Sequence, residues 1–250
     1  MNADWRADRR FLSLEERIKH ALVPGKLYLR NLAARRLRRG EPELRALPLL
    51  ARSGTLAIDI GANKGVYSWC LSRICRAVAA FEPNPKICDL LRRSVPDNVT
   101  VHEVALSNAS GTAELILPIQ RSGRYSNQGG TLQTKKLGGA KAYGTWTVAQ
   151  RRLDDYEFAD VSFIKIDVEG FELEVLQGAA ETLRRERPTL LIEIDESQSK
   201  RPFAETLAAV AALGYDGYFL DDGALRHLGR HAAAGAKPPT DNIIFFYTGT

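Results

Sequence analysis

From residue 55 onward, short apolar runs alternate with segments whose apolar residues recur at helical spacing. The apolar runs are hydrophobic throughout, which is typical of strands that are buried on both faces. Parallel strands need helical crossovers, so this alternation predicts an α/β domain with a mostly parallel sheet between helices. The expected strands are 55–60, 77–82, 99–106, 111–117, 162–170, 188–195, about 215–220 and 242–247, and the expected helices are 64–74, 85–94, 171–186 and 201–215.

Composition narrows the class of protein. The chain has 250 residues, 44% of them hydrophobic and 26% charged, which suits one large globular domain. No run approaches the length of a membrane-spanning helix, and residues 1–17 mix acids and bases where a signal peptide has an apolar core. The three cysteines, Cys70, Cys75 and Cys88, form no CxxC motif. We therefore expect a cytoplasmic protein with reduced, structural cysteines.

The N-terminal segment is basic. Residues 1–52 contain 13 Lys and Arg against 6 Asp and Glu, a net charge of +7, whereas the remainder has a net charge of −2. Within it, residues 30–40 ("RNLAARRLRRG") have apolar residues at roughly helical spacing. This predicts a basic helical extension over 1–50, beside a main domain over 51–250. The extension either packs on the domain or contacts an anionic partner, such as a membrane surface or a phosphorylated glycan. No aromatic residues are interleaved with the bases of residues 30–40, which argues against nucleic acid.

Residues 118–147 differ from the rest of the domain. Gly, Ser, Asn and Lys dominate this stretch, which is too polar for a core. A loop of this length within a domain is usually functional or disordered. We predict that it faces the substrate.

The stretch "LAIDIGANKG" (56–65) indicates a ligand site at the end of the first strand. Ligands of open parallel sheets bind at the carboxyl ends of the strands, and glycines there allow close approach to the backbone. The spacing G-x-x-x-G fits neither a dinucleotide fingerprint nor a P-loop. Asp59 would repel a pyrophosphate and suits an amine or a sulfonium. The small and polar residues of this turn are Gly61, Ala62, Asn63 and Gly65.

A second acid, Glu82, closes the next strand, where its carboxylate could accept both hydroxyls of a ribose. Pro83 and Pro85 stop strand pairing beyond it, and Asn84 either contacts the ligand or caps the next helix. The two acids together describe an adenosine with an amino-acid tail, which is S-adenosylmethionine. Alternatively, both acids cap loops in an unrelated α/β fold. The cofactor-binding residues that we predict are Asp59, Gly61, Ala62, Asn63, Gly65, Glu82, Asn84 and Ala105.

Six elements extend this pattern along the chain: "AIDIGANKGVYS" (57–68), "AFEPNP" (80–85), "VALSNASGTAEL" (104–115), "RLDDY" (152–156), "FIKIDVEGFELEVLQGA" (163–179) and "LLIEI" (190–194). With these elements in this order, the chain resembles FkbM-type S-adenosylmethionine-dependent methyltransferases over roughly residues 50–247. The resemblance implies a class I, Rossmann-like fold with a seven-stranded sheet of order 3-2-1-4-5-7-6 and strand 7 antiparallel. It also implies methyl transfer to oxygen, commonly a hydroxyl of a sugar or a natural product.

The strand that includes "FIKIDVEG" supplies candidate catalytic residues. Lys165, Asp167 and Glu169 alternate onto one face at its carboxyl end. Methyl transfer needs an aligned acceptor and a group that removes the hydroxyl proton. Asp167 or Glu169 could be that base, and Lys165 could stabilise the developing oxyanion or orient a carboxylate. Alternatively, Glu169 caps the helix that opens at Gly170, with Lys165 as its ion-pair partner.

A divalent metal is a weaker possibility. Glu193 and Asp195 end the next strand and could join Asp167 as oxygen ligands for Mg²⁺. We favour no metal, with Glu193 a buried polar group that is hydrogen-bonded at the end of the sheet.

The leading interpretation is an O-methyltransferase that acts on a hydroxyl of a small molecule or a glycan. One alternative is methylation of nitrogen or of a macromolecule, although no "NPPY"-like motif is present. Another is a non-catalytic module that binds an adenosine ligand or a membrane surface. The intact acids and glycines argue against a dead enzyme.

Overall fold

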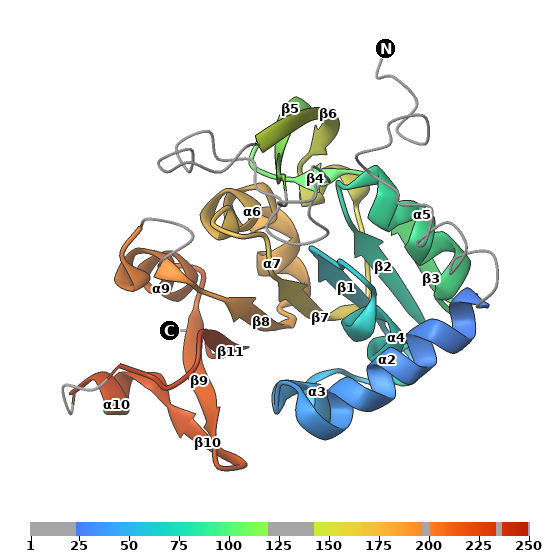
Figure 1. Cartoon of the computed structure of the whole chain (residues 1–250). Coiled ribbons are helices and arrows are strands. Elements are labelled where there is room, and N and C mark those ends of the chain that lie inside the picture. Colours follow the sequence, from blue (N-terminus) through green and yellow to red (C-terminus); the bar gives the residue numbers. More distant parts are fainter. Residues whose placement is uncertain (1–23, 120–142, 197–200, 234–236, 250) are drawn as a thin grey trace.

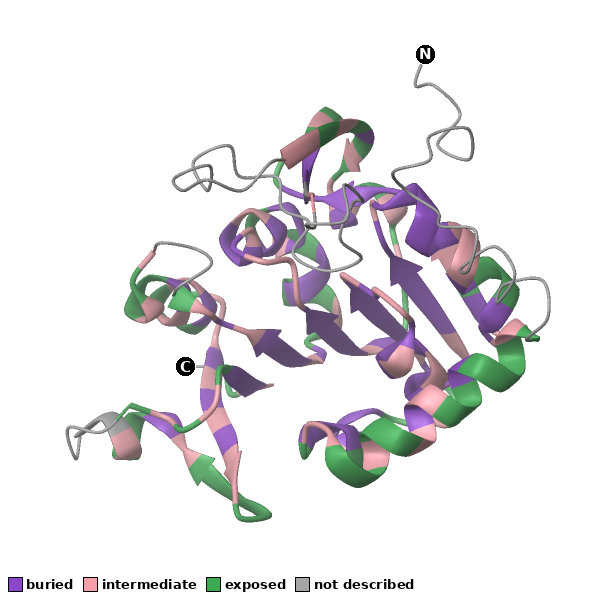
Figure 2. Ribbon diagram, viewed as in Figure 1, coloured by how far each residue is buried: buried purple, intermediate pink, exposed green. Residues whose placement is uncertain are grey.

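An eight-stranded sheet lies at the centre of the computed structural model, which describes residues 24–119, 143–196, 201–233 and 237–249 (Figure 1). The strand order is β10-β9-β11-β8-β7-β1-β2-β3. The central strands are buried on both faces, as their continuous hydrophobicity predicts (Figure 2). The strands are β1 (Leu56–Ile60), β2 (Ala77–Phe81), β3 (Val99–His102), β7 (Val161–Ile166), β8 (Thr189–Glu193), β9 (Tyr215–Asp221), β10 (Ala224–His227) and β11 (Asn242–Tyr247).

The topology places a switch point at β1. This strand pairs in parallel with β2 on one side and with β7 on the other, and β11 runs antiparallel to both β8 and β9. From β3 to β9 the order follows the expected 3-2-1-4-5-7-6, but the expected count of seven is wrong. Asp222 and Gly223, both with positive φ, form a two-residue turn that adds β10 as an eighth strand.

Helices cover both faces of the sheet. One face packs on α6, α7 and α9, and the other packs on α2 to α5 (Figure 1). The expected helix over 171–186 is two helices, which meet at Ala179. No helix in the described ranges is long and apolar enough to cross a membrane. The helices are α2 (Gly25–Arg39), α3 (Glu43–Leu50), α4 (Val66–Ser72), α5 (Pro85–Ser94), α6 (Glu172–Gly178), α7 (Ala180–Glu186), α9 (Phe203–Ala211) and α10 (Leu228–Ala233), with a 3₁₀ turn η2 (Leu153–Tyr156).

A smaller sheet of order β4-β6-β5 is formed by β4 (Ala105–Leu106), β5 (Gly111–Pro118) and β6 (Tyr143–Arg151). The expected strand over 99–106 is therefore divided between two sheets. The predicted loop over 118–147 is also too long, because Tyr143–Thr147 pairs antiparallel with β5. Its remaining part from 120 to 142 lies outside the described residues.

The basic N-terminal segment contributes to the core. Leu29 and Ala33 of α2 are fully buried where this helix packs on α4 and α5, and Leu44 and Leu47 of α3 are buried beside them. For residues 24–50, this favours the packed-helix interpretation over a free arm. Residues 1–23 lie outside the described part.

Candidate active site

The turn between β1 and α4 has glycines at two positions where other parts of the chain leave no room for a side chain. Gly61 has φ +79°, and a Cβ there would lie 1.8 Å from the carbonyl oxygen of Asp167. Gly65 has φ +83°, and a Cβ there would lie 2.6 Å from Leu91 Cδ2. Chain packing therefore requires both glycines, and Gly61 also lines the pocket described below, where its role in ligand approach stays a prediction. The two glycines let the loop after β7 and helix α5 approach the turn closely.

Asp59 is the buried acid at the mouth of β1. It shares a sheet face with Ala57, which packs against the helices on the α2 and α4 side. The side chain is 1% exposed, and the Ser68 hydroxyl donates to its Oδ2 at 2.5 Å. Its Oδ1 has no partner among the described residues. Burial raises the pKa of this carboxyl, although Lys165 and Ser68 act against the shift. Asp59 therefore offers a buried acceptor atom.

Glu82 stabilises the same turn. Its two carboxylate oxygens accept the backbone N–H groups of Asn63 and Asn84, each at 2.9 Å. Burial raises the pKa of Glu82 to about 7. Asn84 caps α5 by accepting from the backbone N–H of Lys86 at 3.1 Å, which confirms the capping alternative, whereas its contact with the cofactor stays a prediction. For Glu82, the alternative that the acid caps a loop is therefore correct, because its carboxylate binds the backbone of two loop residues.

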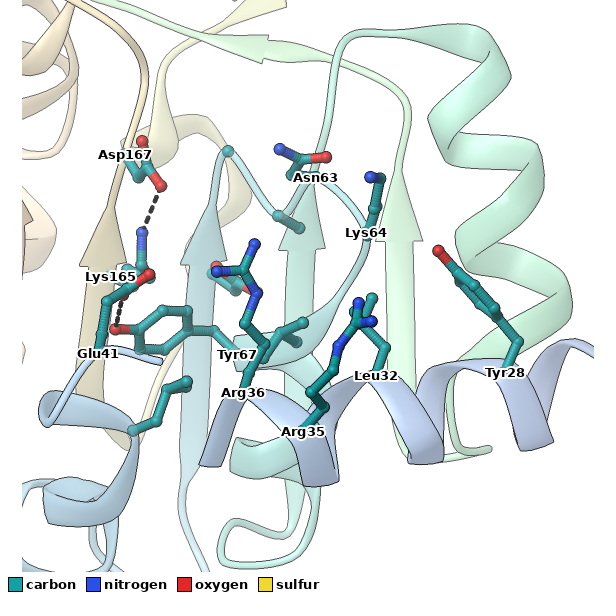
Figure 3. A pocket seen from close by; sticks show the side chains of 15 residues that line it. Tyr28, Leu32, Arg35, Arg36, Glu41, Asn63, Lys64, Tyr67, Lys165 and Asp167 are labelled. Carbon is teal, nitrogen blue, oxygen red and sulfur yellow. Dashed lines mark hydrogen bonds and ion pairs between the residues drawn. The ribbon is translucent and has the colours of Figure 1, made fainter. Parts of the chain in front are cut away.

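A pocket opens between the carboxyl ends of β1 and β7 and the side of α2 (Figure 3). Six of the predicted site residues line it together: Asp59, Gly61, Ala62, Asn63, Lys165 and Asp167. Glu82, Asn84 and Gly65 do not line the pocket, and Ala105 begins β4 of the smaller sheet. The structure thus brings together the residues that follow β1 and β7 but leaves the others in supporting positions.

Lys165 and Asp167 form the ion pair of this pocket, with Nζ and Oδ2 2.7 Å apart. The lysine side chain is 3% exposed and lies over the Tyr67 ring, 4.6 Å from its centroid, whereas Asp167 is 34% exposed. Burial disfavours the charge on Lys165, but Asp167 and Asp59 outweigh it, and the pKa of Lys165 is raised. A charged, buried lysine therefore holds a carboxylate that is open to the pocket.

Glu169 is not part of this arrangement. Strand β7 ends at Ile166, and Glu169 has φ +50° in the turn that follows, so the predicted alternation stops before it. It does not line the pocket. At the start of the next helix, the Glu172 carboxylate accepts the Gly170 N–H at 2.8 Å.

Glu193 and Asp195, the acids that could join Asp167 as metal ligands, form no metal centre within the described ranges. No group of three His, Cys, Asp or Glu there has an arrangement that could hold a metal ion. Glu193, at the end of β8, is half-buried. Burial and the neighbouring Asp167 carboxylate raise the pKa of Glu193 to about 8. Glu193 is thus a partner of Asp167 that is mostly protonated at neutral pH, and Asp195 follows the strand.

Residues of the N-terminal helices complete the pocket wall, and the sequence interpretation missed them. Glu41 accepts a hydrogen bond of 2.5 Å from the Tyr67 hydroxyl, beneath Lys165. Burial, Glu41 and other acids raise the pKa of Tyr67 well above its usual value. Tyr28, Leu32, Arg35 and Arg36 of α2 have the spacing of one helical face, a signal that was present in the sequence.

The residues present fit the cofactor that the sequence predicts. Asp59 Oδ1 and Asn63 Oδ1 are buried acceptors without a partner among the described residues, and both residues line the pocket. Buried polar atoms are rarely left unpaired, so these acceptors suit a donor such as the ammonium group of an amino-acid tail. A nucleotide phosphate would meet repulsion from Asp59.

Comparison with known proteins agrees with this reading. The methyltransferase FkbM domain matches residues 59–216. The chain is 30% identical over 152 residues to the hexuronic acid methyltransferase AglP of Haloferax volcanii, covering 58% of this chain and 59% of that protein. It is 28% identical to the methyltransferase sdnD of Sordaria araneosa, over 62% of this chain and 72% of that protein.

A crystal structure of methyltransferase FkbM from Methylobacillus flagellatus superimposes on 78% of this chain and 44% of that one, with 19% identity and a TM-score of 0.48. The domain match alone spans more than half of the sequence and includes the Asp59 turn, Glu82 and the Lys165–Asp167 pair. The chain therefore belongs to the FkbM methyltransferase family.

Proposed function

We propose that this chain is an S-adenosylmethionine-dependent O-methyltransferase that acts on a hydroxyl of a sugar, a glycan or a natural product. The observation that carries the proposal is the Lys165–Asp167 pair, which opens into the same pocket as the Asp59 turn. The pocket thus combines acceptors for the donor's amino-acid tail with a positioned carboxylate for the acceptor's proton. A metal is not needed for this assignment.

Different residues of the pocket would bind the cofactor and accept the proton. Bound S-adenosylmethionine supplies a methyl group on a sulfonium sulfur, which is a good leaving group. Asp59 and Asn63 would hold its ammonium group, and Glu82 keeps their turn in shape through Asn63. Asp167 would accept the proton of the acceptor hydroxyl, while Lys165 fixes the direction of that carboxylate. The chemistry then requires little beyond alignment and one proton transfer.

The relatives support a sugar acceptor. AglP is named as a hexuronic acid methyltransferase, although the match spans only 59% of that protein. We infer that an acidic sugar is the best first acceptor to test. We also propose that the enzyme works in a reducing compartment such as the cytoplasm, because its three cysteines are buried free thiols.

The test has two stages. Calorimetry should show binding of S-adenosylhomocysteine, and labelled S-adenosylmethionine should then transfer its methyl group to glucuronic-acid-containing glycans, located as an O-methyl signal by NMR. Absence of cofactor binding would reject the proposal. Transfer to nitrogen would favour the alternative of N-methylation, and binding without turnover on any acceptor would favour a non-catalytic module.

A further inference from the structure

The pocket has a basic side that the transfer chemistry does not use. Arg35 and Arg36 extend from α2 toward the turn that carries Asn63 and Lys64, and both arginines and Lys64 line the pocket (Figure 3). Asp167 and Lys165 lie on the opposite side, at the end of β7. A ligand in this pocket would therefore lie between an acid and a group of three cations.

These three cations have no acidic partner in the part of the chain that the structure describes. Other surface cations do have one: Lys26 pairs with Asp97 at 2.6 Å, and Arg92 pairs with Glu103 at 2.8 Å. Lys64 is half-buried, and its pKa is lowered. The main cause is burial, and the nearby positive charges of Arg36, Lys86 and Arg35 add to the shift. Uncompensated positive charges that crowd one wall of a pocket are costly unless an anion joins them.

We propose that Arg35, Arg36 and Lys64 form a subsite for an anionic group of the methyl acceptor, a carboxylate or a phosphate on a sugar. Guanidinium groups match both anions through paired N–H donors, and an ammonium adds a point charge. The subsite rests on the proposed function, because it positions a neighbouring hydroxyl of the same sugar toward Asp167. Arg35 and Arg36 are exposed on α2, where an acceptor could enter from solvent.

The cofactor's own carboxylate is the competing ligand for these cations. The proposed ammonium site, Asp59 with Asn63, lies at the turn, whereas Arg35 and Arg36 belong to the helix across the pocket. Two arginines and a lysine also exceed what one carboxylate needs. We therefore assign them to the acceptor and make the cofactor's carboxylate an outcome of the test.

The experiment titrates the full chain, saturated with S-adenosylhomocysteine, with three sugars followed by ligand-observed NMR. The probes are methyl β-glucuronide, glucose 6-phosphate and the neutral methyl β-glucoside. At least one anionic sugar should bind about tenfold more tightly than the glucoside, with a preference that weakens as salt rises. Whichever anionic sugar binds better identifies the anion as a carboxylate or a phosphate.

The variant pair gives the control. The double substitution Arg35→Gln with Arg36→Gln should reduce the preference for an anionic sugar to less than about threefold. Arg30→Gln with Arg38→Gln removes the same two charges from exposed positions of α2 that do not line the pocket, and this control variant should keep the preference for an anionic sugar. Thermal unfolding of all the variants checks that α2 remains packed.

Three results would overturn the subsite. The first is equal binding of the charged and neutral sugars, and the second is no binding of any of the three sugars. The third is a weaker affinity of the double variant for S-adenosylhomocysteine, with an unchanged affinity for 5′-methylthioadenosine, which lacks the carboxylate. The last result would assign the cations to the cofactor. Failure of the wild-type chain to bind S-adenosylhomocysteine at all would instead reject the proposed function.

Discussion

At the scale of single residues, Asp167 is the side chain on which the proposed chemistry depends. Its carboxylate is held by Lys165 at 2.7 Å and is one-third exposed to the pocket. Asp167→Asn keeps the size of the side chain but removes the base. We expect kcat to fall by ~10²–10⁴, the usual contribution of a positioned proton acceptor, while S-adenosylhomocysteine affinity changes little. Steady-state kinetics and calorimetry measure the two quantities.

A matched control is Asp222→Asn, in the exposed turn between β9 and β10, where Asn also tolerates the positive φ of 46°. This variant should retain wild-type turnover. Full activity of Asp167→Asn would mean that alignment alone suffices and that the base assignment is wrong.

Gly61 allows a second test at the residue scale, because Gly54 has the same φ of +79°. Alanine at Gly54 would meet nothing within 4 Å, so Gly54→Ala should cost only the strain of a left-handed residue, about 1–2 kcal/mol. Gly61→Ala adds a Cβ against the carbonyl oxygen of Asp167, and the overpacking should cost about 1–3 kcal/mol more. Urea unfolding of both variants measures the difference. Equal losses would contradict the close approach of the two loops.

At the scale of elements, the sequence predicted the central strands well. Their continuous apolar runs have no other stable location than between two helical layers. The sequence-based prediction failed where a strand is defined by its pairing with a distant strand and not by its own residues. Nothing local distinguishes β4 from a continuation of β3, because only pairing with β6 divides them. Tyr143–Thr147 reads as polar loop until its partner β5 is known.

Some residues of the candidate site could likewise be predicted from the sequence, and others could not. Asp59, Lys165 and Asp167 could be predicted because parallel strands deliver their carboxyl ends to one edge. The placement of Glu169 failed, because the alternation was extended past the end of β7 at Ile166. The contribution of α2 could not be predicted, since helical spacing defines a face of a helix but not the surface on which it docks.

The docking of α2 makes a prediction of its own. Leu29 is fully buried against the domain, whereas Leu27 on the same helix is 38% exposed. Leu29→Ala should lower the free energy of unfolding by about 2–5 kcal/mol, the usual cost of a buried cavity. Leu27→Ala should change it by about 0.5 kcal/mol or less. Chemical denaturation of the full chain tests both, and a small effect of Leu29→Ala would revive the free-arm interpretation.

At the scale of the whole molecule, the fold concentrates buried acids at one end of the sheet. Asp59 lies in β1, Glu82 follows β2, the half-buried Glu193 ends β8, and Lys165 is a buried cation among them. Part of this charge is suppressed by proton uptake, since burial raises the pKa of Glu82 to about 7 and that of Glu193 to about 8. The site is therefore assembled at a cost in stability that depends on pH.

The sign of that dependence follows from proton linkage. In the unfolded chain both glutamates ionise near the ordinary carboxyl pKa of 4.5, so above pH 6 only the folded protein still holds their protons. The folded state must release them as the pH rises from 6.5 to 8.5, and its free energy of unfolding should fall over this window. His102, whose pKa burial lowers, titrates below it. Glu193→Gln should lessen the fall, whereas Glu205→Gln, on the exposed side of α9, should not. Urea titrations at the two pH values measure this, and an unchanged stability at pH 8.5 would show that the acids at the end of the sheet are already ionised at pH 6.5.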